Sequence, residues 1–152
     1  TDPPRLAEDL AIPHELSGGR ELSADFVYRM IHAFGGAESF YSRFYLTALS
    51  PVGFVREGKN FNYYDIKGLP EVLDEWMAGA MAAQVAAGCD RRVAFSMGMG
   101  ANMKYVQAFN DRHGFFDRIE ALPHPRWVMQ YRRKRLEEFL GVYVDALRAE
   151  IR

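Results

Sequence analysis

Residues 122–135, LPHPRWVMQYRRKR, form the stretch of this sequence that constrains the fold most strongly. Pro123 and Pro125 fix their own φ angles and disfavour helical conformations for the residues before them. His124 is therefore expected on a stiff, non-helical bend, where its imidazole can face a ligand and the basic residues that follow can attract an anion. The alternative is a plain connection between a strand and a helix, with an exposed histidine and solvated basic side chains.

The length and composition predict a single globular domain over residues 1–152. The formal net charge is −1, so any site for a polyanion has to be a local basic patch. Cys89 is the single cysteine, which excludes intramolecular disulfides and multi-cysteine zinc sites and favours a reducing compartment such as the cytoplasm. The sequence has no run of about 18 apolar residues, which predicts that it does not span a membrane.

Strands alternate with helices along the chain after an irregular segment over residues 1–22. Ser23 is the expected N-cap of the first helix, which Gly35 and Gly36 end. Helices are expected over residues 24–34, 37–43, 70–87, 101–112 and 128–151, and strands over 44–49, 92–97 and the second half of 115–122. This order predicts an α/β fold, a three-layer α/β/α sandwich with a central, mostly parallel sheet, in which ligands bind at the carboxyl ends of the strands.

The connection over residues 51–69 is long for a compact domain, and loops of this length are more often functional than idle. It contains glycine, asparagine and lysine residues and four aromatic residues, Phe54, Phe61, Tyr63 and Tyr64. This composition suits the wall of a pocket for a planar, polar ligand. Alternatively, the aromatic side chains only pack the loop onto the core.

A glycine-rich turn, Gly98-Met99-Gly100, joins the strand expected over 92–97 to the next helix. Such a turn lets a phosphate approach the free N–H groups at the start of the helix, and Lys104 in the first turn would add a positive charge. The motif is weak by itself, because glycines at this place also serve only to pack a helix against a strand.

Three candidate segments thus follow expected strands: Ser50-Pro51, the Gly98-x-Gly100 turn and the His124 bend. In this order they resemble the uracil-DNA glycosylase superfamily, and within it the branch of the single-strand-selective monofunctional enzymes together with a bacterial group like them. The match covers residues 20–140 through FYLTALSPVGF, GKNFNYYD, FSMGMGANMKY and LPHPRWVMQYRRKR. The His-Pro loop is its most specific part.

The resemblance implies a catalytic role for His124, which would hydrogen-bond the pyrimidine O2 as negative charge builds there during cleavage of the N-glycosidic bond. Pro125, Arg126 and Trp127 would form a wedge that props open the gap left by a flipped nucleotide. Further DNA contacts are expected from Gly98, Gly100, Lys104, Gln130, Arg132 and Arg133, and the base pocket is expected to involve Ser50, Pro51, Phe54, Asn60 and Asn62.

The sequence departs from the family pattern in two places. Relatives carry a water-orienting Asn or Asp, and an aromatic residue that stacks on the base, in a loop after an earlier strand. Residues 1–22 do not match that loop, so we expect this chain to lack an N-terminal part of the domain. Many relatives also carry an Asn at the end of the base-reading strand, whereas residues 46–50, LTALS, have none. Asn60, Asn62 or main-chain groups would then read the base.

The leading hypothesis is a monofunctional DNA glycosylase of base excision repair, which removes uracil or a related damaged pyrimidine with water and without a lysine Schiff base. It would act on DNA as a monomer, in the cytoplasm near the nucleoid, and would use no cofactor. No metal site is expected either, because His14, His32, His113 and His124 lack the spacing of metal ligands. Two alternatives are a nucleic-acid-binding module of the same fold without catalysis and a small α/β enzyme that acts on a phosphorylated metabolite at Gly98-x-Gly100.

Overall fold

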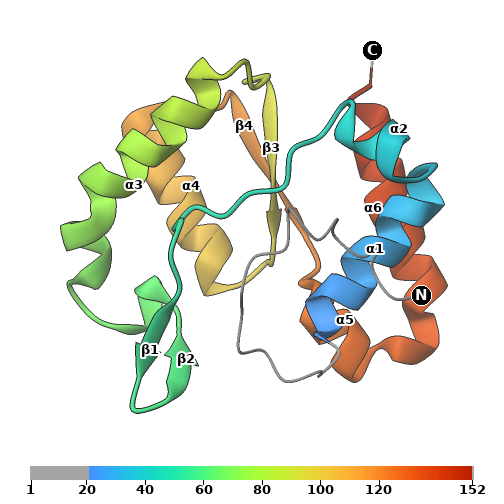
Figure 1. The fold of residues 1–152 in the computed structure, drawn as a ribbon, viewed down its shortest axis with the longest axis horizontal. Coiled ribbons are helices and arrows are strands. Elements are labelled where there is room, and N and C mark those ends of the chain that lie inside the picture. The colour runs from blue at the N-terminus through green and yellow to red at the C-terminus, as the bar shows by residue number, and fades with distance from the viewer. Residues whose placement is uncertain (1–20, 152) are drawn as a thin grey trace, which may run out of the picture. The chain divides into compact units, whose positions relative to one another are not determined.

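The computed structural model describes residues 21–151, which fall into two compact units (Figure 1). Among the described residues, unit 1 contains 21–42 together with Pro125–Ala149, and unit 2 contains Arg43–His124 together with 150–151. The expectations for residues 1–20, including an irregular conformation, lie outside the described part of the chain.

Unit 1 is helical and is organised around the side chains of Phe26 and Tyr143. Their rings meet edge to face with centroids 4.9 Å apart, and both side chains are fully buried. Helix α1 contacts α2, α5 and α6, so the apolar faces of several helices share one core. The elements of this unit are α1 Leu22–Phe34, α2 Ala37–Tyr41, α5 Pro125–Tyr131, the 3-10 helix η3 Arg133–Arg135 and α6 Leu136–Ala149.

The first helix has the expected end but a different N-cap. The side chain of Glu21 accepts a hydrogen bond from the backbone N–H of Ala24 at 2.6 Å, and Ser23 lies inside the helix. The prediction of Ser23 as the N-cap is therefore wrong. A glutamate carboxylate here satisfies a free N–H group and also interacts favourably with the positive end of the helix dipole. At the other end, Gly35 at φ 131° stops the helix, as predicted.

The single helix expected over residues 128–151 is wrong. Helix α5 ends at Tyr131, and Arg132 adopts φ −132° and ψ 21°, which lies outside the helical region. A continuous helix would place the basic side chains of Arg132 and Arg135 one turn apart, where like charges repel. Arg135 pairs with Glu138 of α6, with Nε and Oε2 2.7 Å apart.

Unit 2 contains a parallel strand pair formed by β3 Val93–Met97 and β4 Arg118–Leu122. The register places Met97, the last residue of β3, opposite Leu122, the last residue of β4, so both strands end at the same edge. Helix α4 Ala101–His113 joins the two strands, because parallel neighbours need a crossover connection. The strand, helix and strand expected over residues 92–122 are confirmed.

Helices α3 and α4 supply the core of unit 2. Met77 and Met81 of α3 Leu69–Ala86 pack with Phe109 of α4 in a buried cluster. The apolar side chains of α3 are only partly buried, because Val72 is 79% exposed. The side of α3 that faces the core is therefore defined by its two methionines.

Residues 44–49 do not form the buried strand that their apolar side chains predicted. Within the described chain they pair with no strand, and Tyr45 is 72% exposed. An apolar run fits a strand, but a strand also needs a neighbour that satisfies its N–H and C=O groups. This prediction is wrong.

The connection over residues 51–69 is more regular than expected. β1 Phe54–Arg56 and β2 Lys59–Phe61 form an antiparallel hairpin whose two turn residues, Glu57 and Gly58, have positive φ, as a tight hairpin turn requires. The 3-10 helix η2 Tyr63–Asp65 follows. Tyr63 is 7% exposed, which favours the alternative that this aromatic side chain fixes the connection onto the core.

A carboxylate ties α3 to α4. Asp74 of α3 accepts a hydrogen bond from Arg112 and lies 2.7 Å from Nε2 of His113. The imidazole of His113 packs between the rings of Phe109 and Phe115, with centroids 4.6 and 5.8 Å away. Burial raises the pKa of the Asp74 carboxyl, but the hydrogen bonds from Arg112 and His113 outweigh it, and the pKa lies below its ordinary value.

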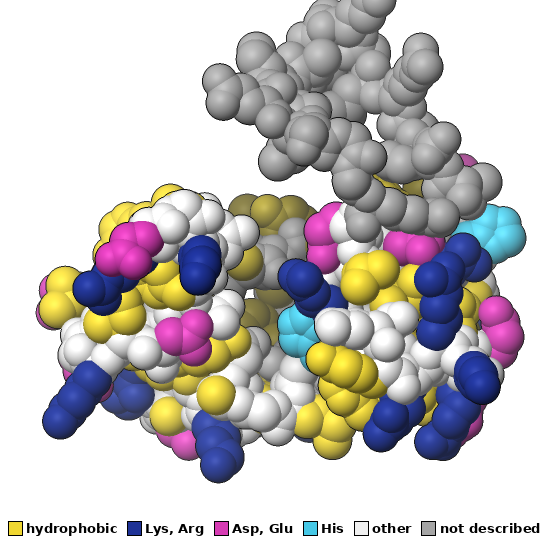
Figure 2. Space-filling model, turned by 90° about the horizontal axis from the view of Figure 1, so that it is seen from below, with side chains coloured by type: hydrophobic (Ala, Val, Ile, Leu, Met, Phe, Trp, Pro, Cys, Tyr) yellow, Lys and Arg dark blue, Asp and Glu magenta, His cyan; other side chains and the backbone are white. Residues whose placement is uncertain are grey.

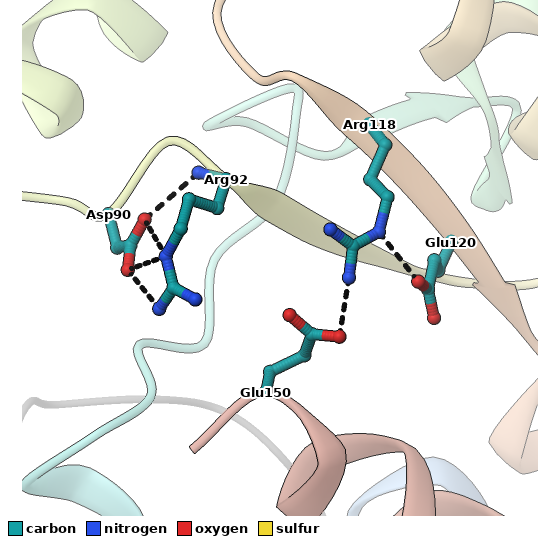
Figure 3. A network of polar contacts seen from close by, with 5 residues as sticks. All are labelled: Asp90, Arg92, Arg118, Glu120 and Glu150. Atoms are coloured by element: carbon teal, nitrogen blue, oxygen red, sulfur yellow. Dashed lines mark hydrogen bonds and ion pairs between the residues drawn. The ribbon is translucent and has the colours of Figure 1, made fainter. Parts of the chain in front are cut away.

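A second polar network surrounds the starts of β3 and β4 (Figure 3). Asp90 accepts two hydrogen bonds from the guanidinium of Arg92, at 2.9 and 2.6 Å. Arg118 donates to Glu120 and to Glu150, which follows α6. Most of these side chains are well exposed, and such pairs contribute about 0–1 kcal/mol each.

We expect Asp74→Asn to lower the free energy of unfolding at pH 7 by roughly 1 kcal/mol, because it removes a charge-assisted tie between α3 and α4. The native pKa of Asp74 is depressed, so the stabilisation is present above the ordinary value of 3.8 and is lost as the pH falls through the lower native pKa. Urea unfolding at several pH values measures this. The difference between the parent protein and Asp74→Asn should shrink below pH 4, whereas Asp111→Asn on the outer side of α4 should have little effect at any pH. An equal loss for both variants would contradict the assignment.

Candidate functional site

The carboxyl ends of β3 and β4 bring two of the predicted site segments together. The N–H of Gly98, the first residue after β3, donates to the carbonyl of Leu122 at 2.8 Å. A Cβ atom placed on Gly98 would lie 3.4 Å from Cδ2 of His124. The side chain of this histidine, which comes shortly after β4, therefore packs against the turn that follows β3. Gly98 is buried and His124 is exposed.

Gly98 has a conformation that other residues rarely adopt. Its φ is 148°, in the region that favours glycine, and its N–H is also 3.0 Å from the carbonyl of Ser96. This N–H is therefore engaged within the protein. The expectation that the glycine turn offers N–H groups to a phosphate now depends on Gly100 and on the first turn of α4.

The start of α4 is open to a ligand. A Cβ atom on Gly100 would meet nothing within 4 Å, and both Gly100 and Lys104 are exposed. The side chain of Lys104 extends from the first turn, where a cation adds to the attraction that free N–H groups exert on an anion. This arrangement is chemically suited to a phosphate.

A hydrogen-bonded chain that the sequence did not reveal supports the turn. The hydroxyl of Tyr63 donates to Oδ1 of Asn102 at 2.8 Å, and Nδ2 of Asn102 lies 3.5 Å from Oγ of Ser96 at the end of β3. Burial, together with the neighbouring hydroxyls of Tyr64 and Tyr105, raises the pKa of Tyr63, so its hydroxyl stays a donor. Asn102 lies two residues after Gly100, and this closeness to the glycine turn was the one signal in the sequence that could have identified it.

The residues expected in the base pocket lie in the same unit as His124 but have local partners. The hydroxyl of Ser50 donates to the carbonyl of Val52 at 2.9 Å. Three others lie in or next to the β1–β2 hairpin: Phe54 faces Phe61 with ring centroids 5.6 Å apart, Asn60 lies opposite Val55, and Pro51 is exposed before β1.

Asn62 serves the local fold. It caps η2, and its backbone N–H and Nδ2 donate to Oδ2 of Asp65 at 2.8 and 3.0 Å. Asn60 keeps an exposed side chain on β2. Of the two asparagines expected to read a base edge, Asn60 is thus the one whose amide makes no hydrogen bond within the described part of the chain.

The remaining expected DNA contacts belong to unit 1. Pro125 begins α5 and is buried, whereas Arg126, Gln130 and Arg133 are exposed. Trp127 is 38% exposed, and the guanidinium of Arg132 lies over its ring, with Cζ 4.8 Å from the ring centroid.

The described residues provide neither a metal cluster nor a membrane helix. Within residues 21–151, no three His, Cys, Asp or Glu side chains gather as a metal ion would require. No helix in the same residues is long and apolar enough to cross a membrane.

The chain is similar to a solved structure. No family model matches the chain, and no curated protein matches its sequence. The crystal structure of wild-type SMUG2 from Pedobacter heparinus is similar, with a TM-score of 0.82 and 36% sequence identity. The match covers 91% of this chain and 61% of that protein.

This similarity confirms the resemblance to the uracil-DNA glycosylase superfamily and the expected α/β fold with a parallel sheet. The two proteins share sequence as well as fold, and the aligned region extends over nearly the whole of this chain. The chain is thus similar in sequence and in fold to this SMUG2 structure over most of its own length, and it spans about three fifths of that protein.

Proposed function

We propose that the protein to which this chain belongs is a monofunctional DNA glycosylase, which hydrolyses the N-glycosidic bond of uracil or a related damaged pyrimidine in DNA. The observation that carries the proposal is the packing of His124 against Gly98 at the carboxyl ends of two paired strands. The similarity to SMUG2 supports the same assignment. In this proposal residues 1–152 form the larger part of one glycosylase domain.

His124 acts on the leaving base. As the bond between the sugar C1′ and the base N1 breaks, the electron pair stays with the base and negative charge builds on the pyrimidine O2. An N–H donor held on a stiff backbone stabilises this charge without reorganising, and one such donor contributes about 3 kcal/mol to the transition state. Water then adds to C1′, and no covalent intermediate with a lysine forms.

Positive charges hold the DNA backbone. Lys104 and the N–H groups at the start of α4 bind one flanking phosphate, and Arg126, Arg132 and Arg133 bind others. Backbone contacts of this kind fix the position of the strand and carry no base specificity. Selection of the base falls to Asn60 and to main-chain groups of residues 50–54.

A nucleic-acid-binding protein of the same fold without catalysis is the second candidate. Residues 46–50 lack the Asn that many relatives use to read the base, and this observation favours it. It predicts DNA binding that weakens steeply with salt, with no abasic product. The glycosylase proposal predicts both binding and product.

We expect His124→Ala to lower the rate of base removal by about 100-fold or more, because a donor to the developing oxyanion is lost. The intact protein is mixed in excess with a uracil-containing oligonucleotide, and abasic sites are counted after alkaline cleavage. His32→Ala, which removes an exposed histidine near the end of α1, is the control and should retain the parent rate. If no form of the intact protein excises uracil, hydroxymethyluracil or another modified pyrimidine, the glycosylase proposal is wrong.

Gly98→Ala tests the support of the histidine. Forcing a side chain to φ 148° costs roughly 1–3 kcal/mol, and the added methyl group would press toward His124. We expect a lower thermal midpoint and a slower excision rate. Gly79→Ala, inside helix α3 with open space around it, is the matched variant and should retain or exceed the parent stability. Equal losses of stability in both variants would show that the conformation of Gly98 does not set the geometry.

A further inference from the structure

Two arginines lie over aromatic rings where α5 gives way to α6. Cζ of Arg132 lies 4.8 Å from the centroid of Trp127, and Cζ of Arg135 lies 5.5 Å from the centroid of Phe139. The two rings also meet each other edge to face at 5.8 Å. Stacking on an aromatic face holds a guanidinium plane in one orientation.

The charge of Arg135 is compensated by a carboxylate, whereas that of Arg132 is not. Glu138 accepts hydrogen bonds from Nε and Nη2 of Arg135 at 2.7 and 2.5 Å, and they hold the pKa of Glu138 below its usual value. Arg132 donates from Nη1 to the carbonyl of Tyr131 at 3.0 Å. Across residues 21–151, no carboxylate pairs with Arg132.

The donors that Arg132 retains suit a phosphate. Its Nη1 is used by the Tyr131 carbonyl, so the edge formed by Nε and Nη2 remains. Two parallel N–H groups on one edge bind a phosphate or carboxylate in a bidentate manner. Figure 2 shows Lys and Arg side chains that extend from many places on the face it draws.

The break after α5 makes this stacking possible. On a continuous helix, residues five apart point about 140° away from each other and do not meet. Arg132 follows Trp127 by five residues, and its non-helical φ of −132° turns the side chain back over the indole.

We propose that Trp127 is a positioning residue, which holds Arg132 as a clamp for a phosphate of the DNA backbone. The guanidinium of Arg132 then covers one face of the indole, the ring of Phe139 meets it at 88°, and Trp127 contacts Arg132 in place of a base. This inference rests on the proposed function only in taking DNA as the partner. It replaces the wedge role that the family resemblance implied for Trp127.

Salt-dependent binding of the intact protein to a fluorescein-labelled, undamaged single-stranded oligonucleotide tests the clamp. Each phosphate contact contributes about 0.7 to the slope of log Kd against log salt concentration for a single strand. We expect Arg132→Ala to reduce the slope by this amount and to weaken binding several-fold. Arg135→Ala is the matched control, because it removes a stacked arginine whose charge is already paired, and it should leave the slope unchanged.

A double-mutant cycle tests the positioning role. Trp127→Leu keeps an apolar contact for Phe139 but removes the aromatic face, so it should weaken binding in the parent and have no further effect in Arg132→Ala. Trp127→Phe retains a ring and should restore most of the affinity. Thermal unfolding of each variant shows whether unit 1 still folds. If Trp127→Leu does not fold, the comparison of Arg132→Ala with Arg135→Ala still tests the clamp.

Three outcomes would overturn the inference: additive losses in the cycle, which indicate a separate contact between Trp127 and DNA; equal slopes for Arg132→Ala and the parent; or no binding to the oligonucleotide at all. Binding with these properties but without base removal would leave the clamp in place and refute only the glycosylase proposal. Base removal with an unchanged slope in Arg132→Ala would refute only the clamp.

Discussion

The hydrogen bond from the Gly98 amide to the Leu122 carbonyl, at 2.8 Å, is the contact on which the candidate site of unit 2 depends. It continues the pairing of β3 with β4 by one residue past the end of β3. The chain after β4 is therefore held against the chain after β3, and the imidazole of His124 comes to lie beside a residue without a side chain. Without that hydrogen bond, the two prolines around His124 would still stiffen the loop, but they would not hold His124 beside Gly98.

The sequence was informative where local chemistry decides the structure. Glycine ends α1 because its positive φ is inaccessible to most residues, and the apolar runs bounded by charged and glycine residues identified β3 and β4. His124 stood out because prolines on both sides restrict its backbone. Its neighbour Gly98 was noted as a phosphate-binding glycine, and the structure adds that its own N–H is occupied.

The wrong or missing predictions concern segments whose conformation is determined by contacts between residues that are distant in the sequence. Residues 44–49 have the apolar composition of a strand, but an apolar composition does not identify a neighbouring strand with which the segment could pair. The break at Arg132 brings together two side chains that are five residues apart, a contact that helical periodicity cannot reveal. The hydrogen bond between Tyr63 and Asn102 joins residues 39 positions apart and becomes visible only in three dimensions.

The stack on Trp127 has an optical consequence. The chain contains two tryptophans, and the other one, Trp76, is 45% exposed on α3 in the other unit. A guanidinium held over an indole changes the electric field on the ring, so the emission of Trp127 depends on what surrounds Arg132. With Trp76 replaced by phenylalanine, the protein would carry a single tryptophan, beside its uncompensated arginine, and events at that arginine could be followed by tryptophan emission without an attached dye.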